Sequence, residues 1–180
     1  MCMLAMSIES NLKIIALLLN DIRSGAKRNA NDSKALRYIM ANVYNATLHE
    51  RLGVDKSVDS PDVVYMSEAF KEEWEAAGRP AGATSLWKIG IHEHAVPFNV
   101  LVSRMVKECS DEQSIYDFIA KNKRMVFVTK AEDKKLNDAG YQRVMAEGGA
   151  DRHEAVGIKV HPEPMVFKNK SKYRGTQNAT

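Results

Sequence analysis

Apolar residues recur at helical spacing in the first third of the chain. Residues 10–22 form a predicted helix that Ser10 can cap, with one face made by Leu12, Ile15, Leu19 and Ile22 and widened by Leu18. A second helix is predicted from Asp32 to Gly53, with an apolar stripe at Leu36, Ile39, Met40, Val43 and Leu48. We expect these two helices to pack as a pair.

The next segment predicts a third helix and then a strand. Ser60 and Pro61 suit a helix start, because proline at the first helical position loses no useful donor, and the stripe continues to Gly78 through Val63, Met66, Phe70 and Trp74. Residues 84–91 are predicted to be extended, with apolar positions at Leu86, Ile89 and Ile91.

Two further helices are indicated after residue 96. Pro97 begins one, whose apolar side carries Phe98, Leu101, Val102, Met105 and Val106. Ser110 with Gln113 has the spacing of a capping box, which predicts a helix that buries Ile115, Phe118 and Ile119.

A short strand and a last helix follow. Residues 125–128 are an apolar run typical of a strand, and Thr129 with Glu132 repeats the capping-box spacing for a helix that ends before Gly140. Beyond it the pattern weakens to a loop at Gly148 and a candidate strand at residues 156–160.

These elements predict an α+β fold, mainly helical, with a small β-hairpin or short sheet. The chain has 180 residues, of which 44% are hydrophobic and 27% charged, an ordinary composition for one globular domain. We expect that domain at residues 1–167, with a helical part at 8–78 and a second part at 84–140, followed by a basic flexible tail at 168–180.

Charge and cysteine content narrow the setting. The net charge is +3, and the last thirteen residues contribute +4, so the rest carries −1 and gives no global footprint for nucleic acid. Cys2 and Cys109 are the two cysteines and are far apart, which favours a reducing compartment, the cytoplasm. No run approaches the ~20 apolar residues of a membrane span, so neither secretion nor membrane insertion is expected.

The candidate chemistry lies between residues 92 and 140. His92, Glu93 and His94 stand at a predicted strand end, and Glu132 and Asp133 follow the next strand. Histidine can take a proton from water near neutral pH, and carboxylates are ligands for Mg²⁺ or Mn²⁺. The pattern indicates a metal-assisted hydrolytic site.

The order Glu93-His94-Ala95-Val96-Pro97 resembles the opening of the HNH, or ββα-metal, nuclease motif. The resemblance covers residues 92–140 and implies a ββα-metal core, with residues 124–129 as its second strand and 130–140 as its helix. It also implies that His94 activates water, that Glu93 helps to hold a divalent cation, and that Asp133, or alternatively Asn137, supplies the closing ligand.

The function expected from this resemblance is a metal-dependent HNH-like endonuclease that hydrolyses DNA or RNA. Its cofactor would be Mg²⁺ or Mn²⁺, and nucleic acid would be its partner. Phosphate contacts would come from the nearby basic residues Lys121, Lys123, Arg124, Lys130, Lys134 and Lys135.

Three alternatives stay open. A strand that continues through His94 puts His92 and His94 on one face, which suits zinc or iron with a third ligand from Glu132, His153 or His161. The histidines can instead be a hydrogen-bonded strand edge, and the capping box alone explains Glu132. The chain can also be a non-enzymatic helical protein that binds nucleic acid or protein through its basic tail. Its oligomeric state is left open.

Overall fold

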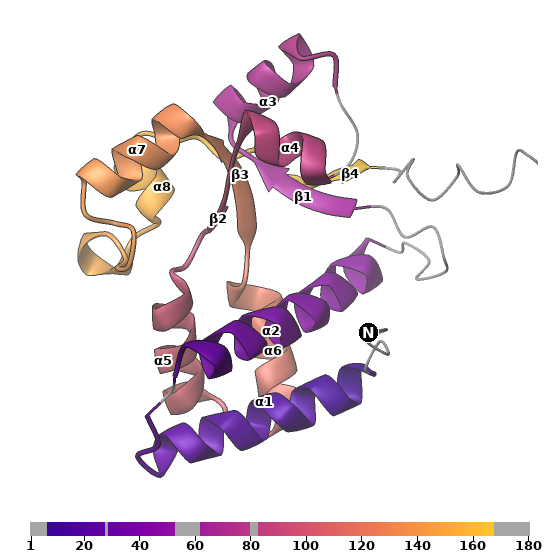
Figure 1. Cartoon of the computed structure of the whole chain (residues 1–180), viewed down its shortest axis with the longest axis vertical. Helices are drawn as coiled ribbons and strands as arrows, with labels where there is room; N and C mark the ends of the chain where they lie inside the picture. The colour runs from indigo at the N-terminus through magenta and orange to yellow at the C-terminus, as the bar shows by residue number, and fades with distance from the viewer. Residues whose placement is uncertain (1–6, 28, 53–61, 80–82, 168–180) are drawn as a thin grey trace, which may run out of the picture. The chain divides into compact units, whose positions relative to one another are not determined.

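The computed structural model describes residues 7–27, 29–52, 62–79 and 83–167, and it confirms the predicted α+β, mainly helical fold. Contacts group the chain into two compact units, each made of two segments. Unit 1 is residues 1–51 with 98–123, and unit 2 is residues 52–97 with 124–180 (Figure 1). The expectation of one domain at 1–167 stays a prediction. None of the helices in the described part of the chain is long and apolar enough to cross a membrane.

The described part of unit 1 contains four helices, α1 (Ile8–Arg23), α2 (Ala30–Arg51), α5 (Phe98–Glu108) and α6 (Glu112–Asn122). The expected pairing of the first two is confirmed, since α1 packs on α2, and both also contact α6. α1 begins earlier than predicted, because the Ser7 side chain accepts a hydrogen bond from the backbone N–H of Ser10. The predicted apolar stripe of α1 is buried at Leu12, Ile15 and Leu19.

The turn between α5 and α6 differs from its prediction by one residue. The capping box pairs Asp111 with Ser114, not Ser110 with Gln113: the Asp111 carboxylate accepts from the Ser114 N–H at 2.8 Å, and Ser114 Oγ accepts from the Asp111 N–H at 3.0 Å. Both acceptors are short side chains that reach the backbone across one turn. The predicted apolar residues of α6 are buried.

Unit 2 is built on a four-stranded sheet in the order β2-β3-β1-β4. The strands are β1 (Asp62–Met66), β2 (Gly90–His94), β3 (Met125–Thr129) and β4 (Met165–Phe167). β2 and β4 each run antiparallel to their neighbour, whereas β1 and β3 are parallel. β4 was not predicted from the sequence.

The predicted third helix is wrong in its first half. Ser60 and Pro61 lie outside the described residues, residues 62–66 form β1, and α3 (Glu68–Ala76) begins after Ser67, whose side chain caps it. The strand is decided by its central place between β3 and β4, which a helical stripe cannot reveal. The apolar residues are nevertheless buried together, and Val64, Met66, Phe70, Trp74, Leu86 and Phe127 make up one core cluster.

The strand predicted at residues 84–91 is also wrong. The chain forms α4 (Ala83–Ile89), with Leu86 buried and Trp87 exposed, and becomes extended only at Gly90. A Cβ at position 90 would lie 2.2 Å from the carbonyl oxygen of Val128 and 2.6 Å from the Phe70 ring. Glycine is therefore the residue that lets α3 and β3 close on the start of β2.

After β3, the chain forms α7 (Lys130–Asp138), the 3₁₀ turn η1 (Glu147–Gly149) and α8 (Arg152–Ala155). The capping box of Thr129 and Glu132 is confirmed. α7 packs on both β2 and β3 (Figure 1). The candidate strand at 156–160 is wrong, because only Val160 forms a bridge, with Ser67, and the backbone N–H of Gly157 closes the turn after α8.

Candidate functional site

The segment expected to carry the chemistry lies on β2, which continues through His94. β2 pairs with β3, and α7 follows directly, so a strand, an antiparallel strand and a helix occur in the expected order. However, His94 lies opposite Met125, at the start of β3, whereas α7 begins after Thr129, which lies opposite Gly90. Four strand residues span about 13 Å. His94 and the beginning of α7 are therefore at opposite ends of the strand pair.

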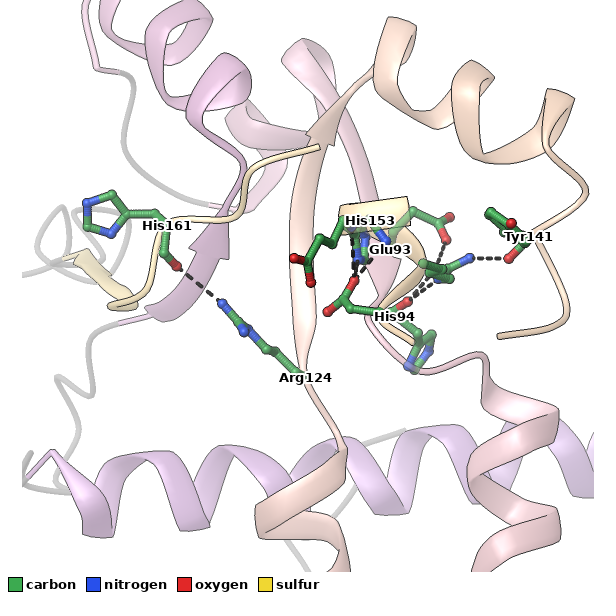
Figure 2. Close-up of polar contacts among 9 residues, drawn as sticks. Glu93, His94, Arg124, Tyr141, His153 and His161 are labelled. Carbon is green, nitrogen blue, oxygen red and sulfur yellow. Dashed lines mark hydrogen bonds and ion pairs between the residues drawn. The ribbon is translucent and has the colours of Figure 1, made fainter. Parts of the chain in front are cut away.

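Glu93 is occupied by an ion pair. Its carboxylate accepts from Nη2 of Arg152 at 2.6 Å, and the Arg152 side chain is only 1% exposed. The same guanidinium donates to the carbonyl of His94 from Nε at 3.0 Å and to the carbonyl of Tyr141 from Nη1 at 2.8 Å (Figure 2). Glu93 thus neutralises a buried cation that ties the end of β2 to the segment after α7.

The other predicted metal ligands have separate partners. Asp133, on α7, accepts from Asn137 at 3.0 Å, and Glu132 accepts from Ser67 Oγ at 2.6 Å and from the Thr129 N–H at 2.8 Å. His92 stacks on Phe127, with ring centroids 4.3 Å apart. Within the described ranges, no three His, Cys, Asp or Glu side chains form a group that could hold a metal ion. The structure therefore does not assemble Glu93, His94 and Asp133.

The zinc alternative has its histidine pair on one face but no third ligand among the described residues. β2 does continue through His94, so His92 and His94 alternate onto one face as that alternative requires. The candidates for its third ligand have other partners. Glu132 accepts a hydrogen bond from Ser67, and Nδ1 of His161 lies 3.0 Å from the carbonyl of Glu163.

The six predicted phosphate contacts are divided between the two units. Lys121 and Lys123 belong to unit 1, and the other four belong to unit 2. Lys123 is 3% exposed, with its amine over the Tyr44 ring, and burial lowers the pKa of that amine to about 8. Lys134 pairs with Asp138 at 2.6 Å, and Lys130 and Lys135 are exposed on α7. Arg124 stands apart, at the opposite end of β3 from α7.

Arg124 lines a cavity in the described part of unit 2, and this cavity is the candidate site. The cavity has a volume of about 390 Å³ and lies among the start of β3, the start of α3 and the segment after η1. Its walls carry the ionisable side chains Glu68, Arg124, Asp151, His153, Glu154 and Lys159. A volume of this size is in the range of small-ligand sites.

One wall of the cavity holds an acid–histidine pair. Asp151 caps α8, accepting from the backbone N–H groups of His153 and Glu154, and its Oδ1 lies 3.3 Å from Nδ1 of His153 (Figure 2). The hydrogen bond from His153 is the main reason that the pKa of Asp151 falls to about 2. Asp151 is therefore ionised at neutral pH and places a proton on Nδ1 of His153.

Two buried nitrogen atoms around this cavity have no hydrogen-bond partner in the protein. One is Nε2 of His153, whose side chain is 1% exposed, and the other is Nε of Arg124. The Arg124 guanidinium lies 4.2 Å above the Tyr65 ring, and its Nη2 donates to the carbonyl of His161 at 3.2 Å. Leaving a buried polar atom unpaired costs about 1–3 kcal/mol, so such atoms call for a ligand or water.

Sequence reasoning placed His153 only as a distant ligand for zinc and gave Asp151 no role. The available signal was local: Asp151 stands two residues before His153, just after the Gly148 loop, where an aspartate can cap a short helix. The contribution of Arg124 to the same cavity comes from pairing between distant strands and carries no local signal.

Comparison of the chain with models of protein families, with curated proteins and with solved structures found no match. The candidate site therefore depends on the geometry alone.

Proposed function

We propose that the protein hydrolyses phosphodiester bonds of nucleic acid, with His153 as the general base in the cavity of unit 2. The observation that supports this is the Asp151–His153 pair in the same cavity wall as two cationic side chains, Arg124 and Lys159. The partner is then nucleic acid, DNA or RNA, and the cysteine content favours the cytoplasm as its setting. The reaction class is the one predicted from residues 92–140, but the catalytic residue differs.

The chemistry follows from the proton positions. Asp151 keeps the Nδ1 proton of His153 in place, so Nε2 has a lone pair that can accept a proton from water. The water oxygen forms a bond to phosphorus, the opposite P–O ester bond breaks, and the leaving oxygen takes a proton from solvent. Arg124 and Lys159 offset the negative charge on the phosphate during the attack.

Access to His153 is the structural requirement of this proposal. Nε2 of His153 is buried, so a water or the substrate can reach it only if neighbouring side chains move. The dependence on a divalent cation, predicted from the sequence, is tested by adding Mg²⁺ or Mn²⁺ to the assay. Glu93 and Asp133 are engaged by Arg152 and Asn137, so no step is assigned to a metal here.

The test is cleavage of plasmid DNA and of a single-stranded RNA, each with Mg²⁺, with Mn²⁺ and with EDTA. His153→Gln should lower the rate by roughly 10²- to 10⁴-fold, the usual contribution of a general base. His161→Gln is the matched control, because that imidazole belongs to unit 2 but does not line the cavity. Circular dichroism and thermal melting establish that each variant is folded.

The same series separates the two candidate sites. Loss of cleavage in His94→Ala with full cleavage in His153→Gln would reject the cavity and favour the ββα-metal site. If the wild-type protein binds both nucleic acids but cleaves neither, hydrolysis is rejected and the non-enzymatic alternative is favoured. The basic tail at 168–180, on which that alternative depends, lies outside the described residues.

A further inference from the structure

The charge pattern of the cavity walls carries information about the form of phosphate that fits. Two cations, Arg124 and Lys159, line the cavity together with three carboxylates, Glu68, Asp151 and Glu154. Counted without His153, the walls carry a net charge of −1, from two cations and three carboxylates. A strongly basic pocket would favour the most highly charged phosphate, and this pocket does not have that character.

A ligand is nevertheless expected in this cavity. Nε of Arg124 and Nε2 of His153 are both buried and unpaired, and His153 is almost fully enclosed. Arg124 holds its guanidinium against Tyr65 and the carbonyl of His161, so its position is set before any ligand arrives. The unpaired N–H of Arg124 favours a ligand that offers an acceptor oxygen, whereas Nε2 of His153, whose partner Asp151 holds the Nδ1 proton, needs a donor such as water.

We propose that the cavity selects a singly charged phosphodiester and discriminates against doubly charged terminal phosphates. This inference rests on the proposed function and assigns the substrate class, namely internal bonds of a strand and not phosphate ends. One negative charge is matched by the guanidinium of Arg124. A second negative charge is repelled by the carboxylates of Glu68 and Glu154. The other cation of the walls, Lys159, is exposed and has a flexible side chain, so it does not provide a fixed positive charge there.

The size of the effect follows from Coulomb's law. An added charge about 7 Å from a carboxylate, at an effective dielectric constant between that of a protein surface and that of water, is disfavoured by roughly threefold to thirtyfold. Salt reduces the discrimination, because the carboxylates of Glu68 and Glu154 are exposed. The discrimination is therefore largest at low ionic strength.

The experiment compares two small probes that differ in charge. Dimethyl phosphate carries one charge at all pH values used, whereas methyl phosphate carries two at pH 8 and one near pH 5, since its second pKa is about 6. Binding is followed by NMR, through the ring resonances of His153 and the Nε–H of Arg124. We expect dimethyl phosphate to bind at least threefold more tightly than methyl phosphate at pH 8, and the ratio to approach one at pH 5. At pH 5 both probes carry one charge, so any change in the charge of the cavity walls affects them alike and cancels in the ratio.

Variants link the ratio to the carboxylates. Replacing both Glu68 and Glu154 by glutamine should bring the pH 8 ratio towards one, whereas Glu147→Gln, an exposed glutamate that does not line the cavity, should leave it unchanged. Arg124→Gln should weaken both probes together.

Three results would overturn the inference: absence of any shift at His153 and Arg124, tighter binding of methyl phosphate at pH 8, or an unchanged ratio in the double variant. Binding of these probes requires no hydrolysis. Failure of the nuclease assay with a normal ratio would therefore reject only the proposed function, and cleavage with an abnormal ratio would reject only the inference.

Discussion

Replacing Arg152 by methionine should strongly destabilise unit 2. The Arg152 side chain is 1% exposed, and its guanidinium donates to the Glu93 carboxylate at 2.6 Å and to the carbonyl groups of His94 and Tyr141. Methionine fills similar volume but leaves the Glu93 carboxylate, 23% exposed, without its cation and two carbonyl groups without their donor.

Removing one partner of a buried ion pair costs about 3–5 kcal/mol. With a urea dependence of about 2 kcal/mol per molar, the unfolding midpoint of the variant should fall by roughly 2 M. The assay is urea unfolding followed by far-ultraviolet circular dichroism and by tryptophan fluorescence, since Trp74 and Trp87 both lie in unit 2.

Lys134→Met is the matched control. Lys134 and Asp138 are also 2.6 Å apart, but their side chains are 74% and 63% exposed, so losing this pair should cost no more than about 0.5 kcal/mol. The double variant Glu93→Gln with Arg152→Met should lose less than the sum of the single losses, because each single change strands the other partner. Equal midpoints for Arg152→Met and Lys134→Met would refute the reasoning that burial gives the Glu93–Arg152 pair its importance.

Three further predictions concern single side chains. Lys123→Met should stabilise unit 1 by about 1–3 kcal/mol at pH 7, because burial lowers the pKa of Lys123 to about 8 and so disfavours its charged form. In urea unfolding at a series of pH values, the stability of the wild type should rise from pH 8 to about 10.5, and its difference from the variant should disappear. A difference that does not change with pH would contradict this. In thermal unfolding, Glu132→Ala should lower the stability by about 2–4 kcal/mol and Asp111→Ala by about 1 kcal/mol. Glu132 is buried and also accepts a hydrogen bond from Ser67, whereas Asp111 caps an exposed turn. Equal losses would show that the contact with Ser67 contributes nothing. The pKa of Asp151 is lowered by His153 to about 2, so its ionised form should stabilise the fold by about 1 kcal/mol above pH 4, after allowance for its exposure. This stabilisation is lost as the pH falls towards 2, and in acid unfolding Asp151→Asn should remove it. An acid transition that is the same in the variant and the wild type would argue against the Asp151–His153 pair.

Interactions within one or two turns of the chain could be predicted from the sequence. The capping box of Thr129 and Glu132 is correct, and so are the apolar stripes of α1 and α6, because a cap or a stripe depends on residues three or four positions apart. The mainly helical α+β fold follows from such local signals. The same signals mislead at residues 62–66, where Met66, Phe70 and Trp74 are buried as expected although a strand precedes the helix.

Contacts between residues far apart in the chain account for what the local patterns do not fix. β1 is a strand because it lies between β3 and β4, and Glu93 is the counter-ion of Arg152, 59 residues away, although the sequence suggested a metal ligand. The cavity brings Arg124 beside the segment of His153 in the same way. Local sequence was enough for the helices of unit 1 and for the cap of α7, and it showed which residue types are available for chemistry. Which of those residues share a site depends on sheet pairing and buried charge, and these involve partners that no short stretch of sequence contains.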